Sequence, residues 1–343
     1  MLTQTMQYDV AIIGAGPVGL AAAIACRRAG LNGIVIEKGA LVESIRRWPE
    51  DTTFFSEGKN IEIGGYPIVT TQQKPGRREA IHYYRKVAER EQLQILTHSK
   101  VTEISRGEYA YHIAYEQYQG AQTLSARYVI VATGYFDRPN RLGVPGEELP
   151  HVSYHYREPI DYWNKLVTII GGSNSAVENA LDLYRNGAKV TVIHRGDSMR
   201  DTVKYWLTPD FNNRVKEGSI QTEFNARVVE IKAHEVIIDR EGERYHVPTD
   251  FVLINAGFSA VDWPLRALGA EFKGDKVVLD EHYETTVPGL FIAGSAGFGR
   301  DTRSVFIENG REHAEVVAAE IARRHRQRES KNALQEASTA SNS

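Results

Sequence analysis

The stretch Tyr8-Asp-Val-Ala-Ile-Ile-Gly-Ala-Gly-Pro-Val-Gly19 decides the fold of this 343-residue chain. Residues 8–13 form a short apolar run typical of a buried strand, and the alanine-rich residues 17–30 are typical of a helix that ends at a glycine. Another apolar run at 33–37 predicts the next strand. A strand, a glycine turn, a helix and a returning strand together predict a Rossmann-like α/β unit.

The turn in this stretch, residues 14–19, is a GxGxxG motif that we call the first glycine turn. In such a motif Gly14 permits the tight turn, Gly16 lets a pyrophosphate approach the backbone, and Gly19 lets the helix pack on the strand. The first N–H groups of the helix face the anion. Glu37, at the end of the next strand, suits a ribose hydroxyl. The motif predicts a bound dinucleotide and does not by itself distinguish FAD from NAD.

A second unit of the same kind begins at residue 167, with a predicted helix over 176–186 and a strand over 189–194. Its turn is a GxGxxA variant, which we call the second glycine turn. It consists of Gly171, Gly172, Ser173, Asn174, Ser175 and Ala176, with Ser173 in place of the middle glycine. Because it follows a strand and opens a helix, it predicts a second dinucleotide site.

The residues after this second unit favour NADPH over NADH. The strand ends at His194-Arg195, where an NADH site carries an acid, and Arg200 lies in the following turn. A guanidinium group pairs with the 2′-phosphate of NADPH, whereas a carboxylate would repel it. The alternative is that Arg195 and Arg200 are ordinary solvated surface residues.

Composition and charge limit the possible functions. With 42% hydrophobic and 25% charged residues the chain is typical of a globular protein, and its length suits two domains. The net charge of −3 does not suit nucleic acid. The first apolar stretch is too short to span a membrane and no cleavable signal precedes it, so we expect a cytoplasmic protein. The pattern predicts no metal site.

Further apolar strands at 128–132, 251–255 and 290–294 predict the returns to two sheets. We therefore expect an α/β protein with two Rossmann-like, three-layer domains, the second inserted in the first. The expected boundaries are 1–143 with 258–327 for the first domain and 144–257 for the second. Residues 328–343 are polar and lack an apolar period, so we expect them to be disordered.

Two dinucleotide sites in one chain favour electron transfer between the two ligands, because a simple dehydrogenase needs only one. The natural arrangement sets a nicotinamide against an isoalloxazine ring, with hydride passing to the flavin. The protein then contributes position and electrostatics. We predict no catalytic side chain beyond the flavin itself.

Several motifs resemble those of the thioredoxin-reductase-like flavoproteins, namely Ala132-Thr133-Gly134 and the return at Ala293-Gly294. More narrowly, the chain resembles the bacillithiol disulfide reductases of the YpdA (Bdr) type. The motifs that carry this resemblance are Ile36-Glu-Lys-Gly39, Thr53-Phe-Phe-Ser56, Gly171 to Val177 and Val305-Phe-Ile-Glu-Asn-Gly310. The resemblance covers nearly the whole chain. It implies FAD in the first domain, NADPH in the second, reduction of a low-molecular-weight thiol disulfide, and a homodimer.

The resemblance also implies a larger set of FAD-site residues. Those near the adenine half are Gly14, Gly16, Gly19, Glu37 and Lys38. Those near the flavin are Phe54, Ser56, Ala132, Thr133, Gly134, Gly294 and Ser295. Ser295 departs from the aspartate of thioredoxin reductases, a departure that the bacillithiol reductases share. Glu308 and Asn309 begin a helix whose N–H groups suit the flavin pyrimidine edge.

Thiol chemistry is where the chain departs from the family pattern. Val18 stands in the slot where better-known members carry the cysteine proposed to be catalytic. The single cysteine, Cys26, lies about 12 Å further along the helix, and we expect it in the core. One cysteine excludes a CxxC pair. Residues 151–158 replace the CxxC segment of thioredoxin reductases, and they fit a substrate mouth or a polar hinge equally well through His151, Tyr154, His155 and Tyr156.

Three other functions stay open at this point. A ferredoxin or flavodoxin NADP reductase also lacks CxxC, although Ser295 and a tail without aromatic residues differ from that class. A flavin monooxygenase lacks support because its FxGxxxH signature is missing. A non-catalytic flavin redox sensor would bind FAD without turning over NADPH. The expected partner is therefore a small disulfide or a small electron-carrier protein.

Overall fold

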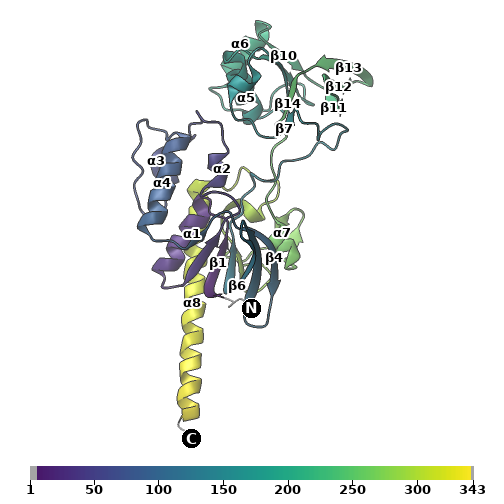
Figure 1. Cartoon of the computed structure of the whole chain (residues 1–343). Helices are drawn as coiled ribbons and strands as arrows, with labels where there is room; N and C mark the ends of the chain where they lie inside the picture. The colour runs from purple at the N-terminus through teal and green to yellow at the C-terminus, as the bar shows by residue number, and fades with distance from the viewer. Residues whose placement is uncertain (1–5, 341–343) are drawn as a thin grey trace. The chain divides into compact units, whose positions relative to one another are not determined.

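The computed structural model describes residues 6–340, and residues 1–5 and 341–343 lie outside the description. The chain divides into two compact units (Figure 1). Unit 1 comprises residues up to 46, 51–138 and from 258 onward, and unit 2 comprises 47–50 and 139–257. Each unit is described by itself below.

Unit 1 is built on a seven-stranded sheet in the order β3-β2-β1-β6-β5-β4, with β17 pairing with β6. The strands are β1 (Met6–Ile13), β2 (Gly33–Ile36), β3 (Ile95–Leu96), β4 (Lys100–Arg106), β5 (Tyr111–Gln117), β6 (Gly120–Val131) and β17 (Leu290–Ile292). β1 pairs in parallel with β2 and with β6, whereas β4, β5 and β6 form an antiparallel meander. Residues 10–13 of β1 are buried, as expected of a central strand covered on both faces.

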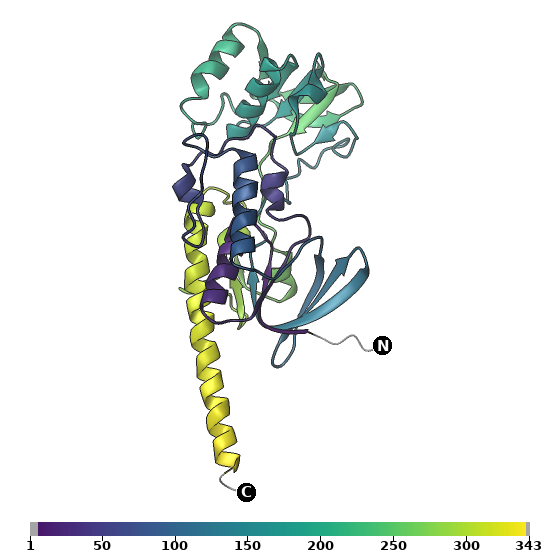
Figure 2. The same cartoon turned by 60° about the vertical axis from the view of Figure 1, so that its left-hand side comes forward.

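The helices of unit 1 position the first glycine turn. They are α1 (Pro17–Arg28), α2 (Glu43–Arg46), α3 (Gly58–Ile61), α4 (Arg77–Arg90), α7 (Trp263–Ala267) and α8 (Ile307–Ala340), with a 3₁₀ turn η2 (Gly294–Gly297). A two-stranded sheet joins β15 (Phe272–Lys273) to β16 (Lys276–Val277). α1 packs on β1 and β2, and α8 runs beside α1 in both views (Figures 1 and 2).

Unit 2 repeats the Rossmann arrangement with a parallel sheet in the order β10-β9-β8-β14-β7. Its elements are β7 (Val152–Ser153), η1 (Pro159–Tyr162), β8 (Leu166–Ile170), α5 (Asn174–Arg185), β9 (Lys189–Ile193), α6 (Thr208–Lys216), β10 (Ile220–Glu223) and β14 (Phe251–Ile254). A separate antiparallel sheet consists of β11 (Arg227–Ile231), β12 (Glu235–Arg240) and β13 (Glu243–Pro248). Two Rossmann-like units, the second within the first, confirm the predicted fold class.

The C-terminal segment differs from its prediction. Residues 328–340 were expected to be disordered, but the structure continues α8 as one helix to Ala340, and residues 341–343 lie outside the described part. The part of α8 up to Ala322 is docked by buried side chains, and the following residues are mostly good helix formers such as Arg, Gln, Lys and Ala. Propagating an existing helix costs much less than nucleating one, so helix continues without an apolar period.

In the part of the chain that the structure describes, no helix has the length and apolar character required to cross a membrane.

Candidate functional site

The first glycine turn has the backbone that each of its glycines was predicted to provide. Gly14 has a positive φ of 110°, and a Cβ on it would lie 2.6 Å from the carbonyl oxygen of Ala132. A Cβ on Gly19 would lie 2.0 Å from the carbonyl oxygen of Gly14. A Cβ on Gly16, in contrast, would have no atom of the described residues within 4 Å, its own chain neighbours aside. That open space in front of the α1 N-terminus fits a pyrophosphate.

Glu37 is aimed at this turn. One carboxylate oxygen accepts a hydrogen bond from the Ala15 N–H at 2.8 Å, and the other accepts from the Gly39 N–H at 2.8 Å. Burial raises the pKa of Glu37, and the two backbone donors oppose that rise. Its neighbour Lys38 makes an ion pair with Asp137 at 2.8 Å. Each carboxylate oxygen keeps a second lone pair, so Glu37 can still accept from a ribose hydroxyl.

The segment that follows β6 comes next to the same turn. The Ala132 N–H donates to the carbonyl oxygen of Ile13 at 2.9 Å, which holds the segment beside the end of β1. The Thr133 hydroxyl donates to the carbonyl oxygen of Val261 at 2.8 Å, and Gly134, with a φ of 66°, accepts from the Val261 N–H at 2.9 Å. Residues 132–134 are therefore fixed at the carboxyl end of the sheet, where ligands of Rossmann folds bind.

Two segments far apart in sequence meet at the start of α8. The Ser56 hydroxyl donates to a carboxylate oxygen of Glu308, and the side chain of Arg311 donates to the carbonyl oxygens of Lys59 and Glu62. Phe54 is buried. α8 begins at Ile307, so Glu308 lies in its first turn, where the backbone N–H groups of a helix point outward and suit an anionic partner.

Asn309, also in that first turn, has a local role in the structure. Its side-chain oxygen accepts from the Phe306 N–H at 2.8 Å, and its side-chain nitrogen donates to the carbonyl oxygen of Ser304 at 2.7 Å. The amide therefore shapes the loop that leads into α8. This arrangement resembles the capping that a residue near a helix start commonly provides.

Val18 and Gly294 lie against each other at the turn η2. Gly294 has a φ of 78°, and a Cβ on it would lie 3.2 Å from a methyl group of Val18. A Cβ on Gly310 of α8 would lie 3.1 Å from another methyl group of Val18. Ser295, the next residue of η2, is partly exposed. The slot that the family resemblance assigns to a cysteine is thus an apolar contact between α1, η2 and α8.

Cys26 is a core residue, as predicted. Its side chain is fully buried, and burial raises the pKa of its thiol to about 12. A thiol with that pKa is protonated at neutral pH and is shielded from any soluble disulfide.

The second glycine turn, in unit 2, is tightly packed on both of its glycines. A Cβ on Gly171 would lie 2.6 Å from the carbonyl oxygen of Asn255, and one on Gly172 would lie 2.3 Å from the ring of His194. Ser173 is the N-cap of α5 and makes no side-chain capping bond, and Ala176 is buried in the helix. Ser175 is exposed at the open side of the turn. The α5 N-terminus has no acidic residue in its first turn, which suits an anion.

His194, Arg195 and Arg200 come together beside this turn. His194 is buried under Gly172, and its pKa is lowered first by burial and then by the charges of Arg200 and Arg195. The N–H of Arg200 donates to the carbonyl oxygen of Gly172 at 2.9 Å, which holds the arginine loop on the turn. Both arginines are exposed. A neutral imidazole with two exposed arginines fits a phosphate ester.

The polar residues at 151–158 belong to the interior contacts of unit 2. A ring nitrogen of His151 lies 3.1 Å from the carbonyl oxygen of Lys232. The hydroxyl of Tyr154 donates to Glu147, and that of Tyr156 donates to Asp182 at 2.5 Å. These bonds give the two tyrosines a structural use. The backbone of His155 donates to Ser153 at 3.1 Å in the same loop.

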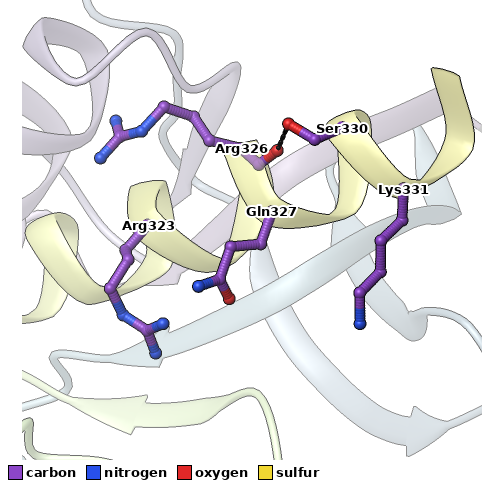
Figure 3. A pocket seen from close by; sticks show the side chains of 5 residues that line it. All are labelled: Arg323, Arg326, Gln327, Ser330 and Lys331. Atoms are coloured by element: carbon purple, nitrogen blue, oxygen red, sulfur yellow. Dashed lines mark hydrogen bonds between the residues drawn. The ribbon is translucent and has the colours of Figure 1, made fainter. Parts of the chain in front are cut away.

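An open hollow of about 520 Å³ lies elsewhere, on one face of α8 (Figure 3). It is lined by Arg323, Arg326, Gln327, Ser330 and Lys331. Arg323 lies thirteen residues beyond Gly310, which is about 20 Å along the helix. Arg323 also pairs with Glu320 at 2.6 Å. The hollow is therefore separate from the first glycine turn and from the Val18 contact.

The chain was compared with known proteins. A family model for pyridine nucleotide-disulphide oxidoreductases matches residues 11–294. The bacilliredoxin reductase Bdr of Bacillus subtilis is 39% identical over 324 residues, which cover 93% of this chain and 99% of that protein. The ferredoxin–NADP reductase of Ignicoccus hospitalis is 29% identical over 297 residues, which cover 83% of this chain and 89% of that protein.

Among solved structures, the bacillithiol disulfide reductase Bdr (YpdA) from Bacillus cereus matches with a TM-score of 0.90 at 37% identity, over 93% of this chain and 100% of that one. Solved thioredoxin reductases share the fold. The predicted family and the predicted class, an NAD(P)H-dependent flavin oxidoreductase, are both confirmed. The chain belongs to the pyridine nucleotide-disulphide oxidoreductase family and, within it, to the bacillithiol disulfide reductases of the Bdr type.

Proposed function

We propose that this protein uses NADPH and FAD to reduce a low-molecular-weight thiol disulfide such as bacillithiol disulfide. The observation that carries the proposal is the similarity to the B. subtilis and B. cereus reductases over 93% of the chain. The glycine turn at 14–19 with Glu37 supports FAD in unit 1. The second glycine turn with Arg195 and Arg200 supports NADPH in unit 2, because two guanidinium groups match a 2′-phosphate.

When bound, FAD supplies two-electron chemistry between NADPH and the acceptor. The chain's own residues then bind and orient. The N–H groups of α1 and the open space at Gly16 suit the FAD pyrophosphate, and Glu37 suits its ribose. Residues 132–134, Ser56 and Glu308 surround the proposed flavin position, and the first N–H groups of α8 favour negative charge there.

The chain offers no thiol for a relay. Val18 fills the cysteine slot, and Cys26 is buried and protonated. In the proposed reaction the disulfide bond breaks, and two electrons and two protons convert the disulfide to two thiols. Because no protein thiol can form a mixed disulfide, the acceptor must take its electrons at the flavin without a covalent protein intermediate.

A second candidate is a ferredoxin or flavodoxin NADP reductase. The observation that favours it is the same apolar contact of Val18, because one-electron carriers need no thiol beside the flavin. The relative from I. hospitalis, named a ferredoxin–NADP reductase, is consistent with it. The two candidates differ in the acceptor alone.

An anaerobic acceptor test separates them. The FAD-loaded protein is reduced with NADPH and then mixed with bacillithiol disulfide, other small disulfides, ferredoxin or flavodoxin, while flavin reoxidation is followed. Reoxidation by a disulfide with release of two thiols supports the first proposal. Reoxidation by a one-electron carrier alone would replace it with the second. Failure of NADPH to reduce the flavin would contradict both.

A further inference from the structure

The loop between β9 and α6, residues 194–207, folds back onto the start of α5. The side chain of Asn174, the first residue of α5, holds the loop on two sides. Its nitrogen donates to the carbonyl oxygen of Thr202 at 3.3 Å, and its oxygen accepts from the N–H of Lys204 at 2.9 Å. Behind the loop, Val203 is buried in the core of unit 2. The backbone of Lys204 is therefore fixed beside the first turn of α5.

The side chain of Lys204 is largely buried in this position, with 19% of its surface exposed. Its ammonium group lies 4.0 Å from a carboxylate oxygen of Glu178 and 5.5 Å from the centre of the Trp206 ring. Burial raises the pKa of Glu178, and Lys204 opposes that rise. Glu178 lies one helical turn beyond Asn174, so the ammonium group runs along the first turns of α5.

We propose that Lys204 is a pyrophosphate-binding residue of the dinucleotide site. The inference rests on the proposed function, because it takes the second glycine turn as the NADPH site. It adds a cation that neither the turn motif nor the arginine pair contains. The N–H groups at the start of α5 and the Lys204 ammonium group then face the same anion from two sides.

Physical reasons favour this use over a purely structural one. A contact of 4.0 Å with Glu178 is at the outer limit of an ion pair, so the ammonium group loses little when it exchanges this contact for a stronger one. One helical turn, about 5.4 Å, separates the level of Glu178 from the first N–H groups, which is within the reach of the four-carbon side chain. Ser173 replaces the glycine that usually brings backbone close to the pyrophosphate, and a lysine offsets that poorer approach.

The site divides into two subsites with different chemistry. Arg195 and Arg200 are assigned to the 2′-phosphate, which NADPH has and NADH lacks. Lys204 is assigned to the pyrophosphate, which both have. Removal of Lys204 must therefore weaken NADP⁺ and NAD⁺ by the same factor, whereas removal of Arg195 weakens NADP⁺ selectively.

The test measures binding by isothermal titration calorimetry with the full-length, FAD-loaded protein. The variants are Lys204→Met, Lys204→Arg and Arg195→Ala, and Lys216→Met is the matched control because Lys216 is an exposed lysine on α6 of the same unit. The ligands are NADP⁺, NAD⁺ and adenosine 2′-monophosphate, which carries the 2′-phosphate and no pyrophosphate. Thermal unfolding of each variant checks that it is folded.

We expect Lys204→Met to weaken NADP⁺ and NAD⁺ about tenfold each, with adenosine 2′-monophosphate unchanged. Lys204→Arg, which keeps the charge, should recover most of the affinity, and Lys216→Met should bind as wild type. Unchanged binding of both dinucleotides by Lys204→Met, or an equal loss for adenosine 2′-monophosphate, overturns the inference alone. If the wild-type protein binds neither dinucleotide, the proposed function falls and this inference with it.

Discussion

Val18 lies in van der Waals contact range of Gly294, at 3.2 Å from the position that a Cβ on Gly294 would occupy. Gly294 also has a φ of 78°, a backbone conformation that side chains with a Cβ rarely adopt. The contact joins α1 to the turn η2, and Gly310 brings α8 to the same valine. It therefore fixes the three elements that surround the proposed flavin position.

Gly294→Ala should lower the free energy of unfolding by about 1–2 kcal/mol because it places a Cβ at positive φ. The added methyl group also presses on Val18, so we expect weaker retention of flavin. The measurement is denaturant unfolding together with the flavin-to-protein absorbance ratio. Gly274→Ala is the matched control, since its φ of 68° carries the same strain and no described atom lies within 4 Å of its Cβ position. Equal flavin loss in both variants would contradict a specific role for the Val18 contact.

Arg195→Ala should weaken NADPH far more than NADH, by roughly 2 kcal/mol, because it removes a charge-assisted contact to the 2′-phosphate. The KM values for the two cofactors in flavin reduction are the measurement. Loss of the same size for NADH would remove the 2′-phosphate assignment of Arg195.

Cys26→Ala should leave turnover unchanged with every acceptor, since burial raises the pKa of this thiol to about 12 and keeps it from the solvent. A small loss of stability, roughly 1 kcal/mol, is expected from the smaller side chain. Steady-state kinetics and thermal unfolding together test this. A folded variant with lost disulfide reduction would return the thiol to the mechanism.

Arg324→Met should destabilise the protein by roughly 2 kcal/mol. Arg324 donates to both carboxylate oxygens of Glu284 at 2.6 Å, and Glu284 also accepts from the Gly289 N–H at 2.6 Å. Without Arg324, that buried carboxylate loses its cation. Arg323→Met is the control, because Arg323 is half exposed and an exposed pair contributes little. Chemical denaturation of the two variants gives the comparison, and similar losses would argue against the network.

His313 should make stability depend on pH. Its ring stacks on Tyr283 with centroids 3.9 Å apart, and burial lowers its pKa from the ordinary value of 6.5. The unfolded chain therefore binds a proton that the folded chain does not, so stability falls as pH drops below about 6.5. His313→Phe keeps the stacked ring and removes the titration. The melting temperature of the variant between pH 5 and 8 should vary less than that of wild type, and an identical pH profile would contradict the prediction.

The local elements of both Rossmann-like units could be predicted from sequence because their signals are local. A strand, a glycine turn and a helix occupy about 20 consecutive residues, and the roles of Gly14 and Gly19 follow from backbone sterics alone. The predicted strands and helices around both turns agree with β1, α1, β8 and α5 within a few residues. The second turn was predicted despite Ser173 for the same reason.

Other features depended on packing between segments that are distant in the chain. Ser56 and Glu308 are 252 residues apart, and no local pattern indicates that they meet. The position of Lys204 depends on how the loop after β9 folds onto Asn174, which periodicity does not report. The C-terminal helix beyond residue 327 has no apolar face to indicate it, because it propagates from a docked helix.

The sequence by itself therefore determined the two glycine turns, the single cysteine and the arginine pair, since each is a matter of residue identity and short spacing. Only the tertiary structure decided that Cys26 is buried, that Val18 joins α1 to η2 and α8, and that Lys204 lies beside α5. The physical reason is that burial and contact depend on which surfaces the folded units bring together, and this information is spread over the whole chain.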